Sequence, residues 1–245
     1  MTVLGAHQRP RRPRCSPRKE AMIIELHDFN SADKVIANNY PKEWEEIRKV
    51  LGRMPLHLKE SDQAGIQGRP IFDPVGTNGY IKKSLQAKRW KANIPVPNEY
   101  KFMGTDIDFG KNGFIGEAQF SNYPFLLNNI LRAELFFKGG LVLADRKMTC
   151  AFIITKAHMF PASNSTLYYE QAKYQLDALS KNKVFDVPIR LVGLKENVGR
   201  KIHVIWTTYT EARYSRTVSA RAKVTCDISM GRSEKSRCPI KVDKP

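Results

Sequence analysis

The sequence has few of the residues that build metal centres or disulfide frameworks. Its four cysteines form no C-x-x-C pair, and none of its five histidines lies at a zinc-ligand spacing from them. We therefore expect neither a zinc site nor a structural disulfide, and we expect Cys150 to be a small core residue. No apolar run approaches the ~18–20 residues of a membrane span. The N-terminus also lacks the apolar stretch of a secretory signal, so the expected location is cytoplasmic, with no membrane partner.

Acidic residues are scarce relative to basic ones. The chain has 41 Lys and Arg against 24 Asp and Glu, a formal net charge of +17. Both ends are basic, with six cations against one acid in residues 1–20 and seven against three in residues 217–245. Such an excess favours a polyanionic partner, because each Lys or Arg near a phosphate releases condensed counterions. A basic protein kept soluble by its charge would show the same composition.

The length of 245 residues suits one sizeable core with a small appended subdomain. Residues 1–21 are rich in Arg and Pro and have little to bury, so we expect a disordered basic extension there. We expect a single domain over residues 22–218. From residue 219 to 245 the chain is basic and weakly patterned, which predicts a weakly ordered tail.

Helix and strand patterns alternate along the chain, which predicts an α/β fold with a mixed central sheet flanked by helices. A Gly- and Pro-containing loop is expected over 62–79. A helix is expected between 161 and 179, with Ser and Asn residues supplying its N-cap. Further helices are expected over 40–54, 81–90 and 124–137, and strands over 22–29, 104–109, 114–120, 150–155, 189–194 and 203–209.

The segment "GTDIDFGKNGFIGEAQF" (104–120) places carboxylates inside two expected strands. The two-residue period of a strand puts Asp106 and Asp108 on the polar face of the first strand and Glu117 on the polar face of the second. If "GKNG" forms a four-residue loop, Asp108 lies opposite Ile115 and diagonal to Glu117. Diagonal neighbours have Cβ atoms within ~7–8 Å, so the two side chains can converge.

Converging carboxylates repel each other, and the repulsion is relieved by protonation or by a bound cation. Mg²⁺ prefers oxygen ligands, commonly one or two carboxylates with water and substrate phosphate. A metal there could polarise a phosphodiester and activate water. Spacing does not choose between Asp106 and Asp108, and a solvated edge hairpin would show the same pattern.

The carboxylate on one strand followed by Glu-x-Gln on the next resembles the core of PD-(D/E)xK nucleases. Longer stretches, including "IFDPVGTNGYIK", "HMFPASNSTLYYEQA", "VFDVPIRLVGL" and "TTYTEARYSRT", resemble type II restriction endonucleases that cut GATC-centred sites. The resemblance runs from about Met22 to Thr217. It implies a restriction-endonuclease-like core with a small additional β subdomain, and a homodimer acting on double-stranded DNA.

Carried over by position, Asp108 and Glu117 are the implied Mg²⁺-binding carboxylates, and the Ala118 carbonyl is the implied third ligand. Gln119 occupies the position where most of the superfamily has Lys. A neutral amide can hydrogen-bond a water but cannot accept its proton, so the implied role of Gln119 is to orient the nucleophile. Asn93 in "KANIP" corresponds to an Asn that helps to hold that water; a turn role is its alternative.

The resemblance also implies a set of DNA-contacting residues in loops. A capping role is the alternative for Asn164 and Ser165, and phosphate contact without base reading is the alternative for the "RYSRT" segment. The implied target is a six-base palindrome with a GATC centre, AGATCT, cut to leave 5′ overhangs. The residues concerned are Asn122, Asn164, Ser165, Tyr214 and Arg216.

Two further readings stay open at this point. A catalytically weak, sequence-specific DNA-binding protein could retain the nuclease fold, and a repair-type nuclease could read DNA shape. The helix over 124–137 is a candidate dimer interface but could equally be a core helix. A cognate DNA methyltransferase is expected in the same host, because an unprotected genome would be cut.

Overall fold

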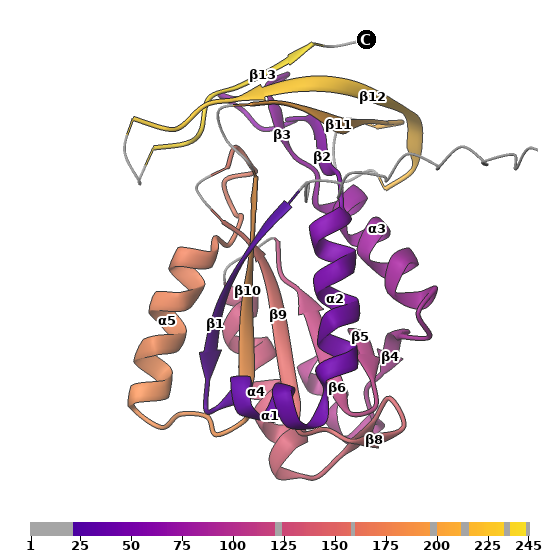
Figure 1. Ribbon diagram of the computed structural model, residues 1–245, viewed down its shortest axis with the longest axis vertical. Helices are drawn as coiled ribbons and strands as arrows, with labels where there is room; N and C mark the ends of the chain where they lie inside the picture. The colour runs from indigo at the N-terminus through magenta and orange to yellow at the C-terminus, as the bar shows by residue number, and fades with distance from the viewer. Residues whose placement is uncertain are drawn as a thin grey trace, which may run out of the picture.

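The computed structural model describes residues 22–120, 124–157, 160–196, 200–211, 216–232 and 236–243. The expected basic extension over 1–21 lies outside the described residues, as do Asn122 and Tyr214. Two sheets organise the described chain, and Figure 1 shows the smaller one above the larger one.

The larger sheet has six strands and is mixed. Strands β10, β9 and β6 run parallel to one another, whereas β1, β5 and β4 pair antiparallel with their neighbours. Strand β9 is buried at every residue, as its run of apolar and β-branched residues predicts for the middle of a sheet. The order across the sheet is β1 (Met22–Phe29), β10 (Ile189–Glu196), β9 (Cys150–Lys156), β6 (Phe114–Ala118), β5 (Asp106–Lys111) and β4 (Lys91–Pro95).

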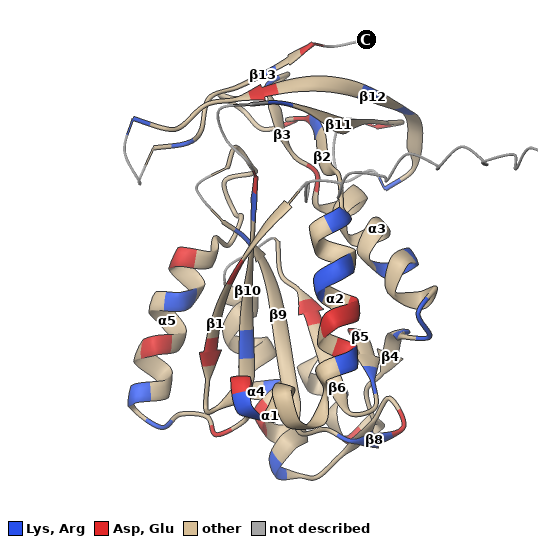
Figure 2. Ribbon diagram, in the orientation of Figure 1, with Lys and Arg blue, Asp and Glu red and all other residues tan. Residues whose placement is uncertain are grey.

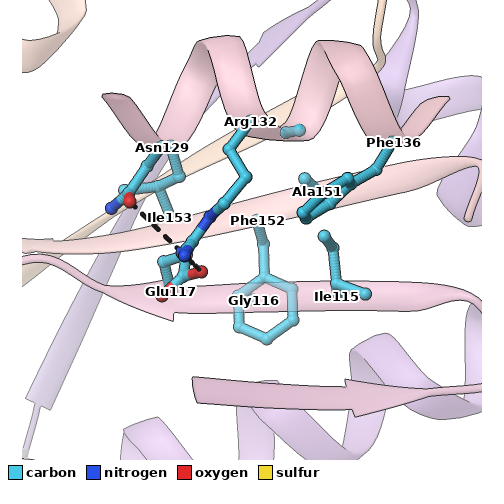
Figure 3. Close-up of a pocket in the computed structure, with 10 residues that line it drawn as sticks. Ile115, Gly116, Glu117, Asn129, Arg132, Phe136, Ala151, Phe152 and Ile153 are labelled. Carbon is cyan, nitrogen blue, oxygen red and sulfur yellow. Dashed lines mark hydrogen bonds and ion pairs between the residues drawn. The ribbon is translucent and has the colours of Figure 1, made fainter. Parts of the chain in front are cut away.

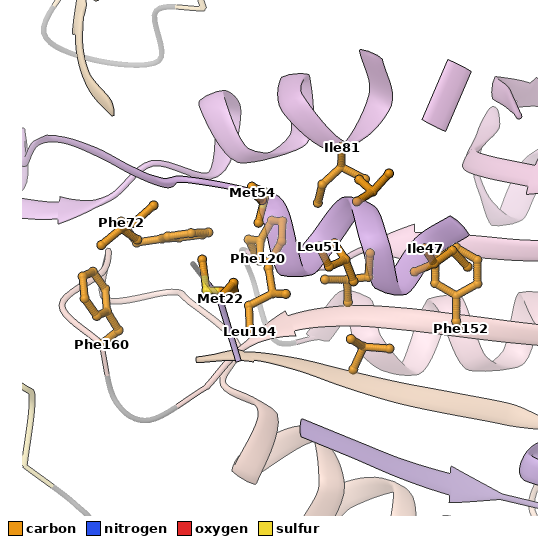
Figure 4. Packing of buried hydrophobic residues seen from close by; sticks show 14 of the residues in the cluster. Met22, Ile47, Leu51, Met54, Phe72, Ile81, Phe120, Phe152, Phe160 and Leu194 are labelled. Atoms are coloured by element: carbon orange, nitrogen blue, oxygen red, sulfur yellow. The ribbon is translucent and has the colours of Figure 1, made fainter. Parts of the chain in front are cut away.

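Helices cover both faces of this sheet. One hydrophobic cluster holds α1 (Ala32–Asn39), α2 (Pro41–Arg53) and α3 (Pro74–Gln86) against one face. Figure 4 shows this packing around Ile47 and Leu51 of α2. A second cluster holds α4 (Pro124–Lys138) and α5 (Tyr169–Lys181) against the other face. The predicted mixed α/β core flanked by helices is therefore confirmed.

The smaller sheet forms the expected additional β subdomain. Its order is β13 (Ile240–Asp243), β12 (Val218–Ile228), β11 (Arg200–Tyr209), β2 (Leu56–Glu60) and β3 (Pro70–Phe72). We expected a weakly ordered tail from residue 219, but the structure places β12 and β13 in this sheet. Val224, Cys226 and Ile228 alternate with polar residues and are buried, a short two-residue period among many charges.

The expected loop over 62–79 is wrong in its second half. Strand β3 lies within it, and α3 begins at Pro74 rather than near Ile81. Asp73 caps the helix by accepting a hydrogen bond from the Val75 N–H at 3.1 Å, and Pro74 suits the first turn. Two glycines in this helix lower its intrinsic helix propensity, which is why the sequence pattern did not predict the first turns of the helix.

Short elements complete the described chain. A 3₁₀ helix, η1 (Asn98–Met103), joins β4 to β5, and β7 (Val142–Leu143) pairs with β8 (Arg146–Lys147). Helix α5 begins at Tyr169, so the Ser and Asn residues of "PASNST" do not cap it as expected. Cys150 is buried, as expected.

Candidate active site

The β5–β6 hairpin has a two-residue turn, not the four-residue loop expected from "GKNG". Asn112 and Gly113 adopt left-handed φ angles of 54° and 85°, as a tight hairpin turn with a matching twist requires. Gly110 consequently pairs with Ile115, and Phe109 pairs with Gly116. The expected pairing of Asp108 with Ile115 is therefore wrong. Continuing the observed register places Asp108 across from Glu117, closer than the diagonal arrangement.

The side chains of Asp108 and Glu117 converge. The two carboxyl groups hydrogen-bond each other, and Asp108 Oδ2 also accepts from the Ala118 N–H at 2.8 Å. Burial raises the pKa of Glu117 to about 8; Asp108 adds to that rise, and the Arg132 guanidinium opposes it. Burial likewise raises the pKa of Asp108. The two acids are therefore poorly solvated and lie side by side. A proton or a bound cation must offset their charge.

Asp106 lies differently from Asp108. It is exposed, and its carboxylate accepts a hydrogen bond from the Thr105 hydroxyl at 3.0 Å. Of these two aspartates, Asp108 is the one whose side chain interacts directly with that of Glu117.

Gly116 allows β6 to lie close to β9. A Cβ atom at this position would fall 2.0 Å from the Phe152 ring, so any larger residue would displace that ring. Figure 3 shows Phe152 beside Gly116, with Glu117 next along the strand. The glycine therefore helps to seat the strand that carries Glu117.

Helix α4 supplies two residues that sequence reasoning missed. Arg132 has a side chain only 7% exposed; it forms an ion pair with Glu117 Oε1 and donates to the Asp106 carbonyl at 3.0 Å. Asn129 Nδ2 donates to Gln119 Oε1 at 3.1 Å. Both surround a cavity of about 10 Å³, room for roughly one water molecule (Figure 3). The sequence does contain a feature that could have identified them. Asn129 and Arg132 are three residues apart, and hence on one face, in a helix that is otherwise mainly apolar.

Gln119 and Asn93 lie on either side of the carboxylate pair: Gln119 directly follows β6, and Asn93 lies in β4, the strand on the other side of β5. Gln119 follows β6 directly, is buried, and has an amide whose orientation is set by Asn129. Asn93 lies in β4 between Ala92 and Ile94, whose partners Phe109 and Ile107 flank Asp108. Both residues are therefore adjacent to the strand positions of the two acids.

The donor set suits a hard divalent cation. It consists of carboxylate oxygens with raised pKa values and, directly after Glu117, the backbone of Ala118. Within the described ranges, no group of three or more His, Cys, Asp and Glu residues could hold a metal. A bound ion would therefore keep other oxygen ligands, which is the usual behaviour of Mg²⁺.

Two of the expected DNA-contacting residues line one cleft. Ser165 and Arg216 belong to a cleft of about 710 Å³ at the end of the smaller sheet, together with Gln63 and Tyr209. The neighbouring Asn164 donates its N–H to Gln63 Oε1 at 2.9 Å. Its Oδ1 accepts from Arg237 Nη2 at 3.3 Å. These contacts occupy Asn164 without any capping role.

A mixed sheet with two convergent carboxylates on a hairpin, and a polar cleft at the smaller sheet, fits a nuclease of the restriction-endonuclease class. The chain belongs to the restriction endonuclease BglII/BglIII family, whose model matches residues 24–194. Members of this class are type II site-specific deoxyribonucleases, and they typically need a divalent metal ion.

Individual relatives agree. The chain is 55% identical over 203 residues to the type II restriction enzyme BglII of Bacillus subtilis, covering 83% of this chain and 90% of that enzyme. It superposes on BglII complexed with a DNA 16-mer with a TM-score of 0.86 at 50% identity, covering 90% of this chain and 99% of that one. Free BglII gives a TM-score of 0.69 at 49% identity with the same coverage. The expected enzyme class is confirmed. None of the described helices has the length and apolarity to cross a membrane.

Proposed function

We propose that this endonuclease hydrolyses one phosphodiester bond in each strand of double-stranded DNA at AGATCT, a six-base palindrome with a GATC centre, and leaves 5′ overhangs. The observation that carries the proposal is the convergence of Asp108 and Glu117 on one part-buried position. The similarity to a BglII–DNA complex supports the DNA substrate.

In the proposed mechanism, Asp108, Glu117 and the Ala118 carbonyl hold Mg²⁺. When bound, the ion polarises the scissile phosphate and lowers the pKa of a coordinated water. Arg132 offsets the charge of Glu117 when no metal is bound, because its guanidinium already contacts that carboxylate. Gln119 orients the attacking water through its amide, which Asn129 holds in place.

Asn93 is proposed to share the task of holding that water. An amide can donate to the water oxygen but cannot remove its proton. The proton is therefore expected to pass to the phosphate or to solvent rather than to Gln119 or Asn93.

For recognition, we propose that Asn122, Asn164, Ser165, Tyr214 and Arg216 contact the DNA from loops. Ser165 and Arg216 support this role because they share a cleft with other polar side chains. Figure 2 shows Lys and Arg distributed over the helices and both sheets, among Asp and Glu. The net charge of +17 is what favours a polyanionic partner.

We propose that the functional unit is a homodimer formed through α4. Leu127, Leu131 and Leu135 repeat every four residues along one stripe of this helix, and their side chains are 44%, 46% and 40% exposed. Phe125 adds a side chain that is 52% exposed. A second copy would cover this stripe, and a two-fold dimer matches the symmetry of a palindrome. A cognate methyltransferase in the same cytoplasm would protect the host site.

A cleavage assay tests the proposal. Purified protein is incubated with plasmid and Mg²⁺, and the fragment ends are sequenced. We expect discrete fragments ending in 5′-GATC overhangs, near-complete loss of cleavage in Asp108→Asn, and retained cleavage in the matched control Asp106→Asn. A gel shift at AGATCT without cleavage would instead identify a catalytically weak DNA-binding protein. Nicking at distorted sites would indicate a repair-type nuclease.

A further inference from the structure

Helix α3 reaches the proposed active site through one side chain. The helix packs against β4, and Lys82 Nζ donates to Asn93 Oδ1 at 3.0 Å. Figure 1 shows α3 and β4 on the same side of the molecule. Position 119, where most of the superfamily has Lys, is Gln in this chain. Lys82, which lies outside the motif hairpin, is a cation that contacts a proposed active-site residue.

Asn93 has an unusual backbone conformation, and Lys82 contacts its side chain. Its φ angle is 50°, in the left-handed region, although it lies inside a strand. The sheet pairing passes over Asn93 and Asp108 while joining the residues on either side of them. Left-handed residues cost free energy and persist where the surroundings hold them, often at functional sites. The left-handed backbone therefore gives the Asn93 side chain a direction different from that of a regular strand residue. Lys82 holds the terminal amide of this side chain through its hydrogen bond to Oδ1.

The contact has a chemical direction. An ammonium group is a donor only, so it selects the oxygen of the amide and leaves the Nδ2 donor for another partner. Without Lys82, the amide could present either its oxygen or its nitrogen, because the terminal torsion of Asn is broad and roughly two-fold.

We propose that Lys82 is a positioning residue for DNA hydrolysis: it fixes the Asn93 amide so that Nδ2 holds the attacking water. The inference rests on the proposed function, because the role of Asn93 is part of that proposal. Lys82 acts through Asn93 and does not itself touch the reacting atoms.

The position of Lys82 is itself well defined. Asp73 caps the first turn of α3, and Tyr209 of β11 donates its hydroxyl to both carboxylate oxygens of Asp73 at 2.9 Å. The helix is thereby tied at its start to the smaller sheet. Side chains carried by an anchored helix are placed more exactly than those carried by a loop.

Single-turnover cleavage and DNA binding test the inference. Lys82→Ala, Lys82→Arg and the matched control Lys83→Ala are compared, because Lys83 is the next residue on α3, is exposed and carries the same charge. We expect Lys82→Ala to slow cleavage of bound DNA by about 10- to 100-fold, since small misplacements of catalytic groups have effects of this size. Its Kd for DNA without metal should match that of Lys83→Ala, and Lys82→Arg should restore most of the rate.

A double-mutant cycle with Asn93→Ala separates positioning from a general effect of charge. We expect the double variant Lys82→Ala/Asn93→Ala to be no slower than Asn93→Ala alone, because residues that act as one unit are not additive. Additive losses, or a Lys82→Ala rate equal to that of Lys83→Ala, would overturn the inference alone. A wild-type protein that does not cleave, or an Asn93→Ala variant of normal rate, would overturn the proposed function or the role of Asn93 and the inference with it.

Discussion

At the scale of single residues, the raised pKa of Glu117 connects protonation to metal binding. Its pKa of about 8 exceeds the usual 4.5, so between these values the folded protein holds a proton that the unfolded chain does not. The free energy of unfolding therefore falls as pH rises through this window. A divalent cation must displace the same proton, so its apparent affinity should rise by about tenfold per pH unit up to pH 8.

Calorimetric titration of DNA-free protein with Mg²⁺ at pH 6.5 and pH 8.5 measures this dependence. Binding at the lower pH should release close to one proton, detected by repeating the titration in buffers of different ionisation heat. Glu117→Gln should lose both the proton release and most of the affinity. Equal affinities at the two pH values would contradict the coupling.

The buried ion pair of Arg132 with Glu117 gives a second prediction at the scale of single residues. This pair is almost fully buried, whereas the pair of Arg48 with Glu45 is exposed. Breaking a buried pair leaves an unpaired charge and costs about 3–5 kcal/mol, whereas an exposed pair contributes about 0–1 kcal/mol. We expect Arg132→Leu to lower the free energy of unfolding by about 3 kcal/mol in urea titrations at pH 9, above the pKa of about 8 for Glu117, where that carboxylate is ionised, with Arg48→Ala nearly neutral. Adding Glu117→Gln to Arg132→Leu should restore part of the loss; a further loss would argue against the pair.

At the scale of elements, we propose a separate function for each of two opposite sides of α4. One side holds Arg132 and Asn129 against the active-site strand, and the other presents the leucine stripe. Leu131→Lys should therefore convert dimers to monomers in analytical ultracentrifugation, because a buried charge would replace an apolar contact. Tyr174→Lys on α5, where the side chain is 80% exposed, is the matched control and should remain dimeric. A dimeric Leu131→Lys protein would place the interface elsewhere.

The same elements show what a sequence can and cannot reveal. The existence of the hairpin and of α4 follows from periodicity and turn residues, although the length of the hairpin turn does not. Strand alternation and a family resemblance single out Asp108, Glu117 and Gln119, whose roles are proposals. Arg132 and Lys82 were missed because their roles depend on how helices pack against the sheet, which no local pattern encodes. Strand β12 was missed because its apolar period covers only three residues among charged and polar ones.

At the scale of the whole molecule, a net charge of +17 predicts DNA binding that weakens steeply with salt. Each phosphate contact contributes about 0.9 to the slope of log K against log salt.

The role of Arg216 in DNA binding can be tested, because base reading and phosphate contact give different results. If Arg216 contacts a base edge, Arg216→Ala should relax sequence preference at one position and cost about 1–3 kcal/mol at the cognate site.

If Arg216 contacts only a phosphate, the variant should bind all sequences more weakly, and its salt slope should fall by about 1. Competition binding with single-base variants of AGATCT at several salt concentrations separates the two cases. Ser165→Ala is the control, since it lines the same cleft but carries no charge, so its salt slope should equal that of the wild type. We expect the base-reading result, because Gln63, Gln67 and Ser165 line the same cleft and can hydrogen-bond base edges, although Lys59, Glu60, Asp62 and Glu211 line it too. A variant with unchanged sequence preference and a reduced slope would remove Arg216 from the recognition set.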